Sequence, residues 1–391
     1  MNSPAPVCPL PVEDFAPSIT GIEQAVSLPP ACYTSPEFHA FEMDAVWGHE
    51  WFCVGRATDI PNKGDYYSVT VGDDPLMVVR GADGEVHVRS AVCQHRAMPL
   101  IEGRGNARRF RCPYHSWVYG LDGVLQSAPD LNDVPCFDKA AVRLPEVRSE
   151  VWEGFVFITF DDTIAPVAER LGHLSEQLAS YGMSELRAAE PQQLDPYEWN
   201  WKIFADECYH CAHLHAKTWN PVYPTPQERI DFDSKLNDVE RGIIAYDILG
   251  REAGSSPTHT GKVLQPLLPG LTVHEQERLS YVTVMPNLLI VAMPDKVKYF
   301  LWLPTGTKSS VFGATWLYPE STLARPDFEE NWIKEKEDLA GVMVEDVFAW
   351  SGVQRGLHSR FAPRGRYAPS EVVLVRFNQW LAERYTSRAT S

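Results

Sequence analysis

The sequence predicts an α+β protein of two domains, because its N-terminal part is patterned like short β-strands and the remainder mixes strands with longer helices. From about Phe41 to Asp161, short β-type runs alternate with turn-forming residues. From Pro166 to Met183, apolar residues recur at helical spacing instead. We therefore expect three segments: residues 1–44, which pack on the larger domain; a small antiparallel β domain at 45–162; and a domain at 163–391 in which helices cover an antiparallel sheet.

The β domain is predicted from three strand-like runs and the turns between them. Residues 66–71 favour a strand and end at Gly72-Asp73-Asp74. Residues 76–80 lead into Gly81-Ala82-Asp83-Gly84, after which residues 86–88 resume the strand pattern. Glycine and aspartate between such runs are typical of β-hairpins, so we expect antiparallel neighbours here.

The larger domain is predicted from one amphipathic stripe and several longer elements. Its first helix, at 166–183, places four apolar residues on one stripe: Leu171, Leu174, Leu178 and Tyr181. Residues 253–272 are rich in Gly, Pro, Ser and Thr and predict a loop. The remaining expected elements are strands at 288–292 and 298–303 and helices near 198–216, 326–352 and 370–386.

The overall composition favours a soluble cytoplasmic protein. The chain has 391 residues, 44% of them apolar, which is enough for two cores. A formal charge of −17 argues against nucleic-acid partners, and eight cysteines are few enough to suit a reducing compartment. The N-terminus lacks the pattern of a signal peptide, and no run reaches the roughly 18 apolar residues of a membrane span.

Two short clusters of metal-binding residue types stand close together in the β domain. Cys93-Gln94-His95 and Cys112-Pro113-Tyr114-His115 each offer one thiolate and one imidazole. Zinc fingers usually pair cysteine with cysteine and histidine with histidine, so a structural zinc site is the weaker interpretation. Two sulfurs on one iron and two imidazoles on the other are the ligands of a Rieske [2Fe–2S] centre. These four residues therefore predict an electron-carrying cluster.

A second iron site is predicted in the larger domain. His210 and His215 lie close enough on a helix or its end to face one ion, and neutral imidazole is a common ligand of Fe(II). A carboxylate would complete the facial triad that leaves positions open for O2. Asp346 is the candidate, because its helical neighbours are apolar and ligation would offset its burial. Glu345 is the rival, and a capping or surface role for Asp346 is the alternative.

These motifs resemble those of the aromatic-ring-hydroxylating oxygenase α subunits, the Rieske non-heme iron oxygenase family. The resemblance rests on Cys93–Leu100, Phe110–Gly123, Asn200–His215, Glu345-Asp346 and Gln354-Arg355-Gly356-Leu357, and it spans most of residues 45–385. It implies an all-β Rieske domain followed by a catalytic domain of helix-grip type. It also implies cluster ligands at Cys93, His95, Cys112 and His115, and mononuclear iron ligands at His210, His215 and Asp346.

The resemblance further implies that a carboxylate connects the two iron centres. Position by position it is Glu207, which would link His115 of one subunit to His210 of the next, in a homotrimer. Asp206 is the alternative, since residues four apart on a helix face the same way as residues three apart. Relatives usually carry about three more residues between Lys202 and the carboxylate, so the segment before Glu207 departs from the family pattern.

Four arginines lie between the two cluster motifs, against the acidic balance of the chain: Arg104, Arg108, Arg109 and Arg111. One interpretation is a solvated loop. The other is a docking patch for an acidic electron donor.

Together these features predict the terminal oxygenase of a multicomponent system. It would use O2, and electrons from a partner reductase or ferredoxin, to hydroxylate a small aromatic or quaternary ammonium compound. NAD(P)H would act only through that partner, since the sequence shows no glycine-rich dinucleotide motif after a strand. One alternative is oxidative N-demethylation of a betaine-like or carnitine-like compound. An alternative of another class is a Rieske electron-transfer protein without catalysis.

Overall fold

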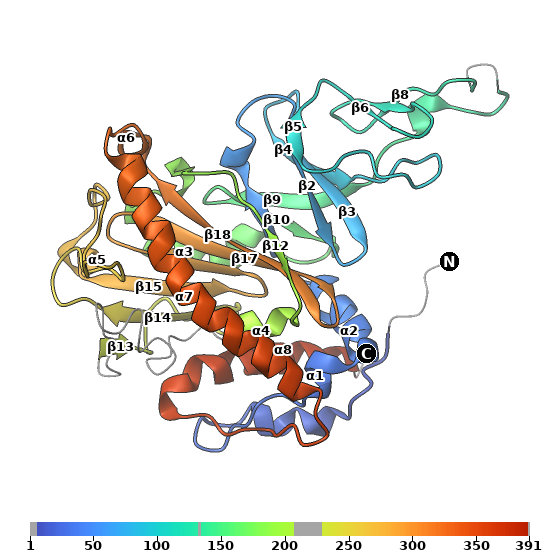
Figure 1. Cartoon of the computed structure of the whole chain (residues 1–391). Coiled ribbons are helices and arrows are strands. Elements are labelled where there is room, and N and C mark those ends of the chain that lie inside the picture. The colour runs from blue at the N-terminus through green and yellow to red at the C-terminus, as the bar shows by residue number, and fades with distance from the viewer. Residues whose placement is uncertain (1–5, 132–133, 207–228, 390–391) are drawn as a thin grey trace. The chain divides into compact units, whose positions relative to one another are not determined.

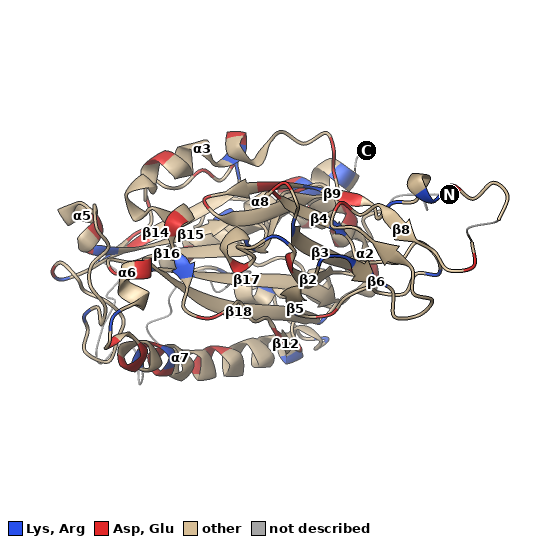
Figure 2. Ribbon diagram, turned by 90° about the horizontal axis from the view of Figure 1, so that it is seen from above, with Lys and Arg blue, Asp and Glu red and all other residues tan. Residues whose placement is uncertain are grey.

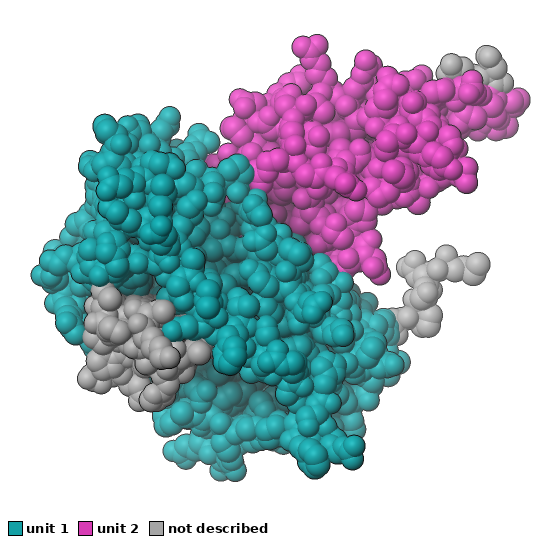
Figure 3. Space-filling view, in the orientation of Figure 1, with its two compact units in different colours: residues 1–49, 168–391 teal, residues 50–167 magenta. Residues whose placement is uncertain are grey.

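The computed structural model describes residues 6–131, 134–206 and 229–389. The chain divides into two compact units, coloured separately in Figure 3. The smaller unit spans residues 50–167, and the larger unit combines residues 1–49 with 168–391. Along the described residues, no helix is long and apolar enough to cross a membrane.

The smaller unit is built from antiparallel strands, as predicted. Within its described residues, seven strands form one sheet in the order β1-β10-β9-β4-β3-β2-β5, and β6, β7 and β8 form another. The strands are β1 (Phe52–Arg56), β2 (Asp65–Val71), β3 (Asp74–Arg80), β4 (Val86–Ser90), β5 (Arg104–Asn106), β6 (Phe110–Arg111), β7 (Val118–Tyr119), β8 (Leu125–Ser127), β9 (Glu146–Trp152) and β10 (Phe155–Thr159).

The predicted hairpins lie at the middle of the seven-stranded sheet. Tyr66 pairs with Val79 between β2 and β3, and Val78 pairs with Val88 between β3 and β4. Val78 and Val79 are fully buried. Both sides of β3 are therefore paired, which places this strand in the interior of the unit.

The larger unit contains an antiparallel sheet of eight described strands. Their order is β11-β18-β17-β16-β15-β14-β13, and β12 also pairs with β18. The strands are β11 (Arg187–Ala188), β12 (Asp195–Tyr197), β13 (Ile230–Asp231), β14 (Ile243–Leu249), β15 (Arg278–Val284), β16 (Leu288–Ala292), β17 (Val297–Gly306) and β18 (Ser309–Tyr318).

Helices cover this sheet, as expected for the α+β class. The long helix α7 lies across one face and α3 lies on the other, as Figures 1 and 2 show together. The start of α7 is held against β18 because Phe328 packs on Tyr318, with ring centroids 5.1 Å apart. The helices are α1 (Ala31–Thr34), α2 (Pro36–Glu42), α3 (Val167–Gln177), α4 (Trp201–Asp206), α5 (Val273–Gln276), α6 (Glu320–Leu323), α7 (Phe328–Leu357) and α8 (Val372–Ala389).

Most of the predicted elements of the larger domain are confirmed. Residues 288–292 and 298–303 are strands, and the helices near 326–352 and 370–386 correspond to α7 and α8. The stripe of the first helix is buried, with Leu171 and Leu174 fully enclosed in α3. Residues 253–272 form a loop that ends at α5. Of the helix expected near 198–216, the described part is α4, and the rest lies outside the described residues.

The prediction that β structure begins near Phe41 is wrong. Phe41 belongs to α2, and Met43–Trp47 continue it as a π-helical turn, so the first strand starts at Phe52. Phe41, Ala45 and Trp47 are buried within the larger unit. Apolar residues are so closely spaced in this stretch that they would be buried in a helix as well as in a strand. The hydrophobic pattern alone therefore does not distinguish the two.

A buried ion pair ties the N-terminal segment to α4 and α8. The Lys202 ammonium lies 2.8 Å from Glu42, and both side chains are fully buried. Trp201 Nε1 donates to the same carboxylate at 2.9 Å, and the Tyr385 hydroxyl also donates to it. A buried carboxylate with this many donors is well compensated, whereas removal of one partner would leave an uncompensated charge. The network therefore fixes the start of α4, the helix that precedes the predicted iron ligands in the sequence.

Candidate functional site

Cys93 and Cys112 lie in two loops of the smaller unit that share one backbone pattern. In each loop the cysteine N–H donates to the carbonyl five residues later, and the N–H four residues later donates back to the cysteine carbonyl. The bonds are Cys93 to Met98 at 2.9 Å, Ala97 to Cys93 at 3.0 Å, Cys112 to Trp117 at 2.7 Å and Ser116 to Cys112 at 3.1 Å. Each cysteine is therefore held at the start of a closed turn.

Both turns close through a residue in the left-handed backbone region. Ala97 has φ of 55° and Ser116 has φ of 59°. This conformation costs roughly 1–2 kcal/mol for a residue with a side chain. The same strain at equivalent positions indicates that both loops are shaped to present the side chains within the turns, which include His95 and His115.

The two imidazole rings come together beside the turns. The ring centroids of His95 and His115 are 4.7 Å apart, and His95 stacks on Trp117 with 4.8 Å between centroids. The two cysteines are only 2% and 1% exposed, whereas His95 is exposed and His115 partly exposed. The sulfur donors thus lie on the core side of the loops and the imidazoles on the solvent side. This separation matches a two-iron cluster with sulfur ligands on one iron and imidazoles on the other.

Two further features of these loops fit a bound iron–sulfur group. Nδ1 of His115 is buried and makes no hydrogen bond within the described residues, which is costly unless the nitrogen binds a ligand. Burial raises the pKa of the Cys93 thiol, and a bound cation offsets that cost for a thiolate.

Tyr119 is a residue of this site to which the sequence analysis gave no role. Its hydroxyl lies 3.4 Å from Cys93 Sγ and accepts the Gln94 N–H at 3.0 Å. Burial, together with the hydrogen bond to Cys93, raises the pKa of Tyr119, which keeps the phenol protonated. A neutral hydroxyl that already accepts one bond has its proton free to donate to a ligand sulfur. The Val118-Tyr119-Gly120 string carried this signal only through the family resemblance.

The four arginines between the cluster motifs are all exposed: Arg104, Arg108, Arg109 and Arg111. Their role as a docking patch for an electron donor stays a prediction.

The larger unit contains a cavity between α7 and the face of the sheet, and the empty space in it, including solvent at its mouth, is about 960 Å³. The residues that line it belong to the strands β14 to β18 and the turn before β17, to the 253–272 loop, to α7 and to the end of α4. The lining residues are Phe204, Tyr246, Ser256, Pro257, Thr258, Tyr281, Leu289, Met293, Lys296, Lys298, Phe300, Trp316, Glu335, Asp338, Leu339, Val342, Met343, Asp346 and Trp350.

Asp346, the predicted carboxylate ligand, lines this cavity from α7 and is partly buried. Its helical neighbours Val342, Met343 and Trp350 line the same cavity, so the apolar face inferred from the sequence is the face that α7 presents to it. Glu345 does not line it. The placement of Asp346 fits the role of an iron ligand, and the ligand role itself stays a prediction.

The other predicted residues of the second iron site lie outside the described residues. These are Glu207, His210 and His215, together with the neighbouring Cys208, Cys211 and His213. Asp206, the rival of Glu207, is the last residue of α4.

Direct contacts hold α4 beside α7. The Asn200 N–H donates to Gln354 Oε1 at 2.7 Å, and both groups are buried. Phe204, near the end of α4, packs against Trp350 of α7 with ring centroids 5.3 Å apart. The Asn200 and Gln354 motifs, noted earlier only as family matches, therefore brace the two helices. As a result α4 ends at the wall of the cavity that Asp346 lines.

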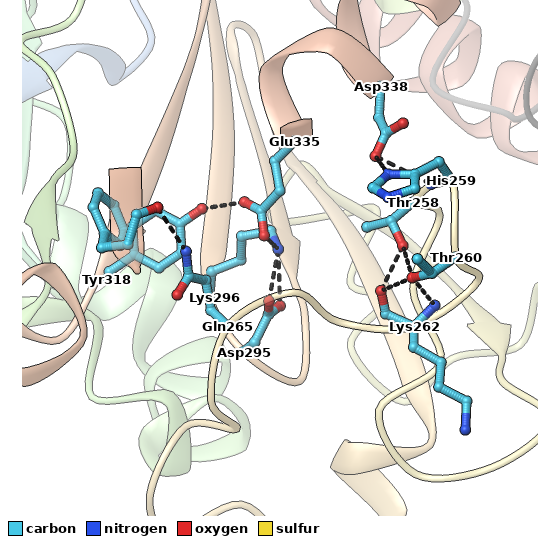
Figure 4. Close-up of polar contacts among 11 residues, drawn as sticks. Thr258, His259, Thr260, Lys262, Gln265, Asp295, Lys296, Tyr318, Glu335 and Asp338 are labelled. Atoms are coloured by element: carbon cyan, nitrogen blue, oxygen red, sulfur yellow. Dashed lines mark hydrogen bonds and ion pairs between the residues drawn. The ribbon is translucent and has the colours of Figure 1, made fainter. Parts of the chain in front are cut away.

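A buried charged cluster borders the cavity through Lys296 and Glu335, and Figure 4 shows its polar contacts. The Lys296 ammonium lies 2.8 Å from Asp295 and 2.9 Å from Glu335, and the Tyr318 hydroxyl donates to Glu335. Burial raises the pKa of Asp295 to about 6. The sequence analysis missed this cluster, because its members come from β18, α7 and the turn before β17.

Comparison with known families shows two matches along the chain. Residues 50–138 match the Rieske [2Fe-2S] domain, and residues 183–387 match the family described as the ring hydroxylating alpha subunit (catalytic domain). The two matched domains imply a Rieske cluster and a mononuclear iron, with electrons supplied by a partner reductase.

Two curated relatives are similar over most of the chain. The glycine betaine monooxygenase oxygenase subunit of Chromohalobacter salexigens is 27% identical, over 93% of this chain and 86% of the relative. The chloroplastic choline monooxygenase of Atriplex hortensis is 27% identical, over 95% of this chain and 80% of the relative.

Solved structures share the fold. A quaternary ammonium Rieske monooxygenase, CntA, aligns with a TM-score of 0.78 at 22% identity, covering 97% of this chain and 100% of that one. Naphthalene 1,2-dioxygenase from Rhodococcus sp. aligns with a TM-score of 0.81 at 20% identity, covering 96% and 98%. With the fold, the cluster loops and the catalytic-domain match in agreement, the chain belongs to the ring-hydroxylating oxygenase α-subunit family, as a terminal Rieske oxygenase subunit.

Proposed function

We propose that this terminal oxygenase hydroxylates a small quaternary ammonium compound. The observation that carries the proposal is the cavity beside Asp346, whose wall is rich in aromatic rings: Phe204, Tyr246, Tyr281, Phe300, Trp316 and Trp350. Faces of such rings attract quaternary ammonium groups, which have no N–H to hydrogen-bond. The relatives named for glycine betaine and choline oxidation support the same substrate class.

The charges on α7 suit a cationic substrate as well. Glu335, Asp338 and Asp346 line the cavity from this helix, and Figure 2 shows acidic residues along it. Carboxylates on one wall lower the cost of bringing a cation out of water. The arene substrates of the naphthalene enzyme would gain nothing from them.

The proposed division of roles follows from where the residues lie. Cys93, His95, Cys112 and His115 would hold the Rieske cluster, and His210, His215 and Asp346 would hold the mononuclear iron. When bound, these groups supply one-electron storage and O2 activation. The aromatic wall binds and orients the substrate and excludes water.

We propose further that Glu207 joins the two centres across a subunit boundary of a homotrimer. The carboxylate of Glu207 would accept an imidazole N–H from His115 of one chain and from His210 of the next, which fixes both ring orientations. The structure of CntA, whose published description refers to inter-subunit electron transfer, supports this arrangement by analogy.

Hydroxylation of an N-methyl carbon would make this protein an oxidative N-demethylase. One O2, two electrons and two protons would give water and an N-hydroxymethyl group. That group loses formaldehyde and a proton to leave the tertiary amine. Hydroxylation at another carbon would release no formaldehyde, so formaldehyde assays separate the two outcomes.

The test is substrate-dependent O2 consumption by the iron-loaded protein with a surrogate reductase. Glycine betaine, choline, benzoate and naphthalene would be compared, with products identified by mass spectrometry. We expect coupled product formation with a quaternary ammonium compound and none with naphthalene. Product formation from the arenes alone would contradict the proposal.

A further inference from the structure

Lys298 is a cationic side chain on the sheet face of the cavity that none of the proposed roles uses. It lies in β17 and belongs to a row of residues paired directly across four neighbouring strand boundaries. The row runs Tyr246, Tyr281, Val291, Lys298 and Trp316. Residues paired in this way point to the same face of an antiparallel sheet. Lys298 is therefore surrounded on the cavity floor by aromatic and aliphatic side chains.

The polar surroundings of Lys298 differ from those of its neighbour Lys296. Lys296 is enclosed by the carboxylates of Asp295 and Glu335. Within the described part of the chain, Lys298 makes no hydrogen bond and no ion pair, and its ammonium lies 5.1 Å from the centroid of the Phe300 ring. Burial and the nearby Lys296 charge lower the pKa of Lys298 to about 8. A lysine without a carboxylate partner in such a place destabilises the fold unless a ligand supplies the partner.

The carboxylates that line the cavity either accept hydrogen bonds from other side chains or are predicted to bind iron. Glu335 accepts from Lys296 and Tyr318, and Asp338 accepts from His259 at 3.1 Å, as Figure 4 shows. Asp346 is the predicted iron ligand. Among its described residues, the cavity therefore has one cation on the sheet side that has no carboxylate beside it, together with aromatic rings that suit a quaternary ammonium group. A ligand that fits both features carries a negative and a positive group.

We propose that Lys298 binds the carboxylate of the substrate, which makes the substrate a zwitterion of the betaine type. The inference rests on the proposed function and narrows it. An ammonium–carboxylate bond inside an apolar wall is strong and selects for the anion. With the carboxylate on the sheet, the trimethylammonium end is directed toward Phe204 of α4 and Trp350 of α7, the helix that also carries Asp346. Choline, which has a hydroxyl in place of the carboxylate, would lose this contact.

The test compares two ligands that share the trimethylammonium group. Binding of glycine betaine and of choline to the iron-loaded protein is measured by calorimetry at pH 7, for the wild type, Lys298→Met and Lys298→Arg. We expect Lys298→Met to weaken glycine betaine binding by roughly 10- to 100-fold, since a charged hydrogen bond is lost. Choline binding should change by less than about twofold, and Lys298→Arg should restore much of the affinity for glycine betaine.

Lys308→Met is the matched control, because Lys308 is exposed and does not line the cavity. It should bind both ligands as the wild type does. Circular dichroism of each variant checks the fold, and equal weakening of both ligands in Lys298→Met would indicate a structural effect and overturn the proposal. Unchanged glycine betaine affinity would overturn it too, while leaving quaternary ammonium oxidation intact.

A third ligand separates failure of this inference from failure of the proposed function. Benzoate carries a carboxylate but no quaternary nitrogen. If the wild type binds benzoate through Lys298 and binds neither quaternary compound, the carboxylate role of Lys298 is supported and the quaternary ammonium function is wrong. If the wild type binds neither glycine betaine nor benzoate, the proposal for Lys298 is overturned.

Discussion

The cluster loops and the aromatic cavity are assembled over very different distances along the chain. From Cys93 to His115, every predicted cluster ligand lies in one short stretch, and the turns that hold the cysteines are closed by hydrogen bonds within the same loops. The cavity takes its wall from α4, five strands and α7, and the strands β13 to β18 lie between Phe204 and Asp346 in sequence. Local geometry suffices for the first site, whereas the second requires the complete fold of the larger unit.

This difference predicts that a substitution can disrupt one site and leave the other intact. It also predicts that a substitution in the link between them can abolish turnover while both sites stay intact. The predictions below run from the largest expected effect to the smallest.

Glu207→Gln tests the link. An amide has one acceptor oxygen and no charge, whereas a carboxylate offers a separate charged oxygen to each imidazole, so we expect substrate turnover to fall about 100-fold or more with both iron centres still occupied. Iron content and the visible spectrum should match the wild type. Asp206→Asn is the control, and a collapse of turnover there with normal turnover in Glu207→Gln would assign the link to Asp206.

The pH dependence of ligand binding tests the electrostatics of the cavity. Since the pKa of Lys298 is lowered to about 8, its ammonium is present below that pH and is lost as the pH rises through it. Glycine betaine, whose carboxylate stays ionised throughout, should bind about 10-fold more weakly at pH 9 than at pH 7. Calorimetry across this range gives the measurement.

Other titratable and charged groups face the same space: Lys296 and Asp295 beside β17, Glu335, Asp338 and Asp346 on α7, Tyr246 on β14 and Tyr281 on β15. Choline binding over the same range reports on them, because choline lacks the carboxylate. Lys298→Arg should flatten the glycine betaine profile. If the pH profile of glycine betaine binding keeps its shape in Lys298→Arg, the titrating group is not Lys298.

Gln354→Ala tests how the fold positions the second site. Removal of the acceptor leaves the buried Asn200 N–H without its partner, at a cost of about 1–3 kcal/mol in the free energy of unfolding. Because this bond braces α4 against α7, we expect weaker retention of the mononuclear iron and an unchanged cluster. Gln354→Glu keeps an acceptor oxygen and is the matched control. Equal loss of the cluster would show that the two sites are not independent.

Tyr119→Phe tests the cluster loops alone. Loss of the hydroxyl beside Cys93 Sγ should lower the reduction potential of the cluster by about 40 mV, the equivalent of a hydrogen bond of about 1 kcal/mol for one electron. Voltammetry of the purified protein gives the shift. Turnover should fall only modestly, and an unchanged potential would mean that the hydroxyl does not donate to the sulfur.

The same contrast explains what sequence reasoning could and could not reach. The residue types and spacing of the cluster motifs predicted a site whose two loops the structure shows. This was possible because hydrogen bonds within each loop determine the conformation of that loop. Asp346 was placed on an apolar face of a helix from its neighbours three and four residues away, and that face lines the cavity. Both inferences used the spacing of residues within a single loop or helix.

Lys298 and Gln354 show where that reasoning ends. Residues 298–303 were recognised as a strand, yet the significance of Lys298 depends on the register of β14 to β18, which no single strand encodes. Gln354 was noted as part of a family motif without a role, because its partner Asn200 is distant in sequence. The misassigned residues 41–47 illustrate the same limit, since burial by distant elements selected a helix there.

The central claim is that one chain carries two separate iron sites, one held by local loops and one dependent on Asp346. The most direct test is iron content, with the visible spectrum, of the reconstituted wild type and of Asp346→Ala, with Glu345→Ala as control. We predict about three irons per chain in the wild type and in the control. Asp346→Ala should hold about two and keep the full colour of the cluster. Two irons in the wild type, or loss of cluster colour in Asp346→Ala, would contradict the account.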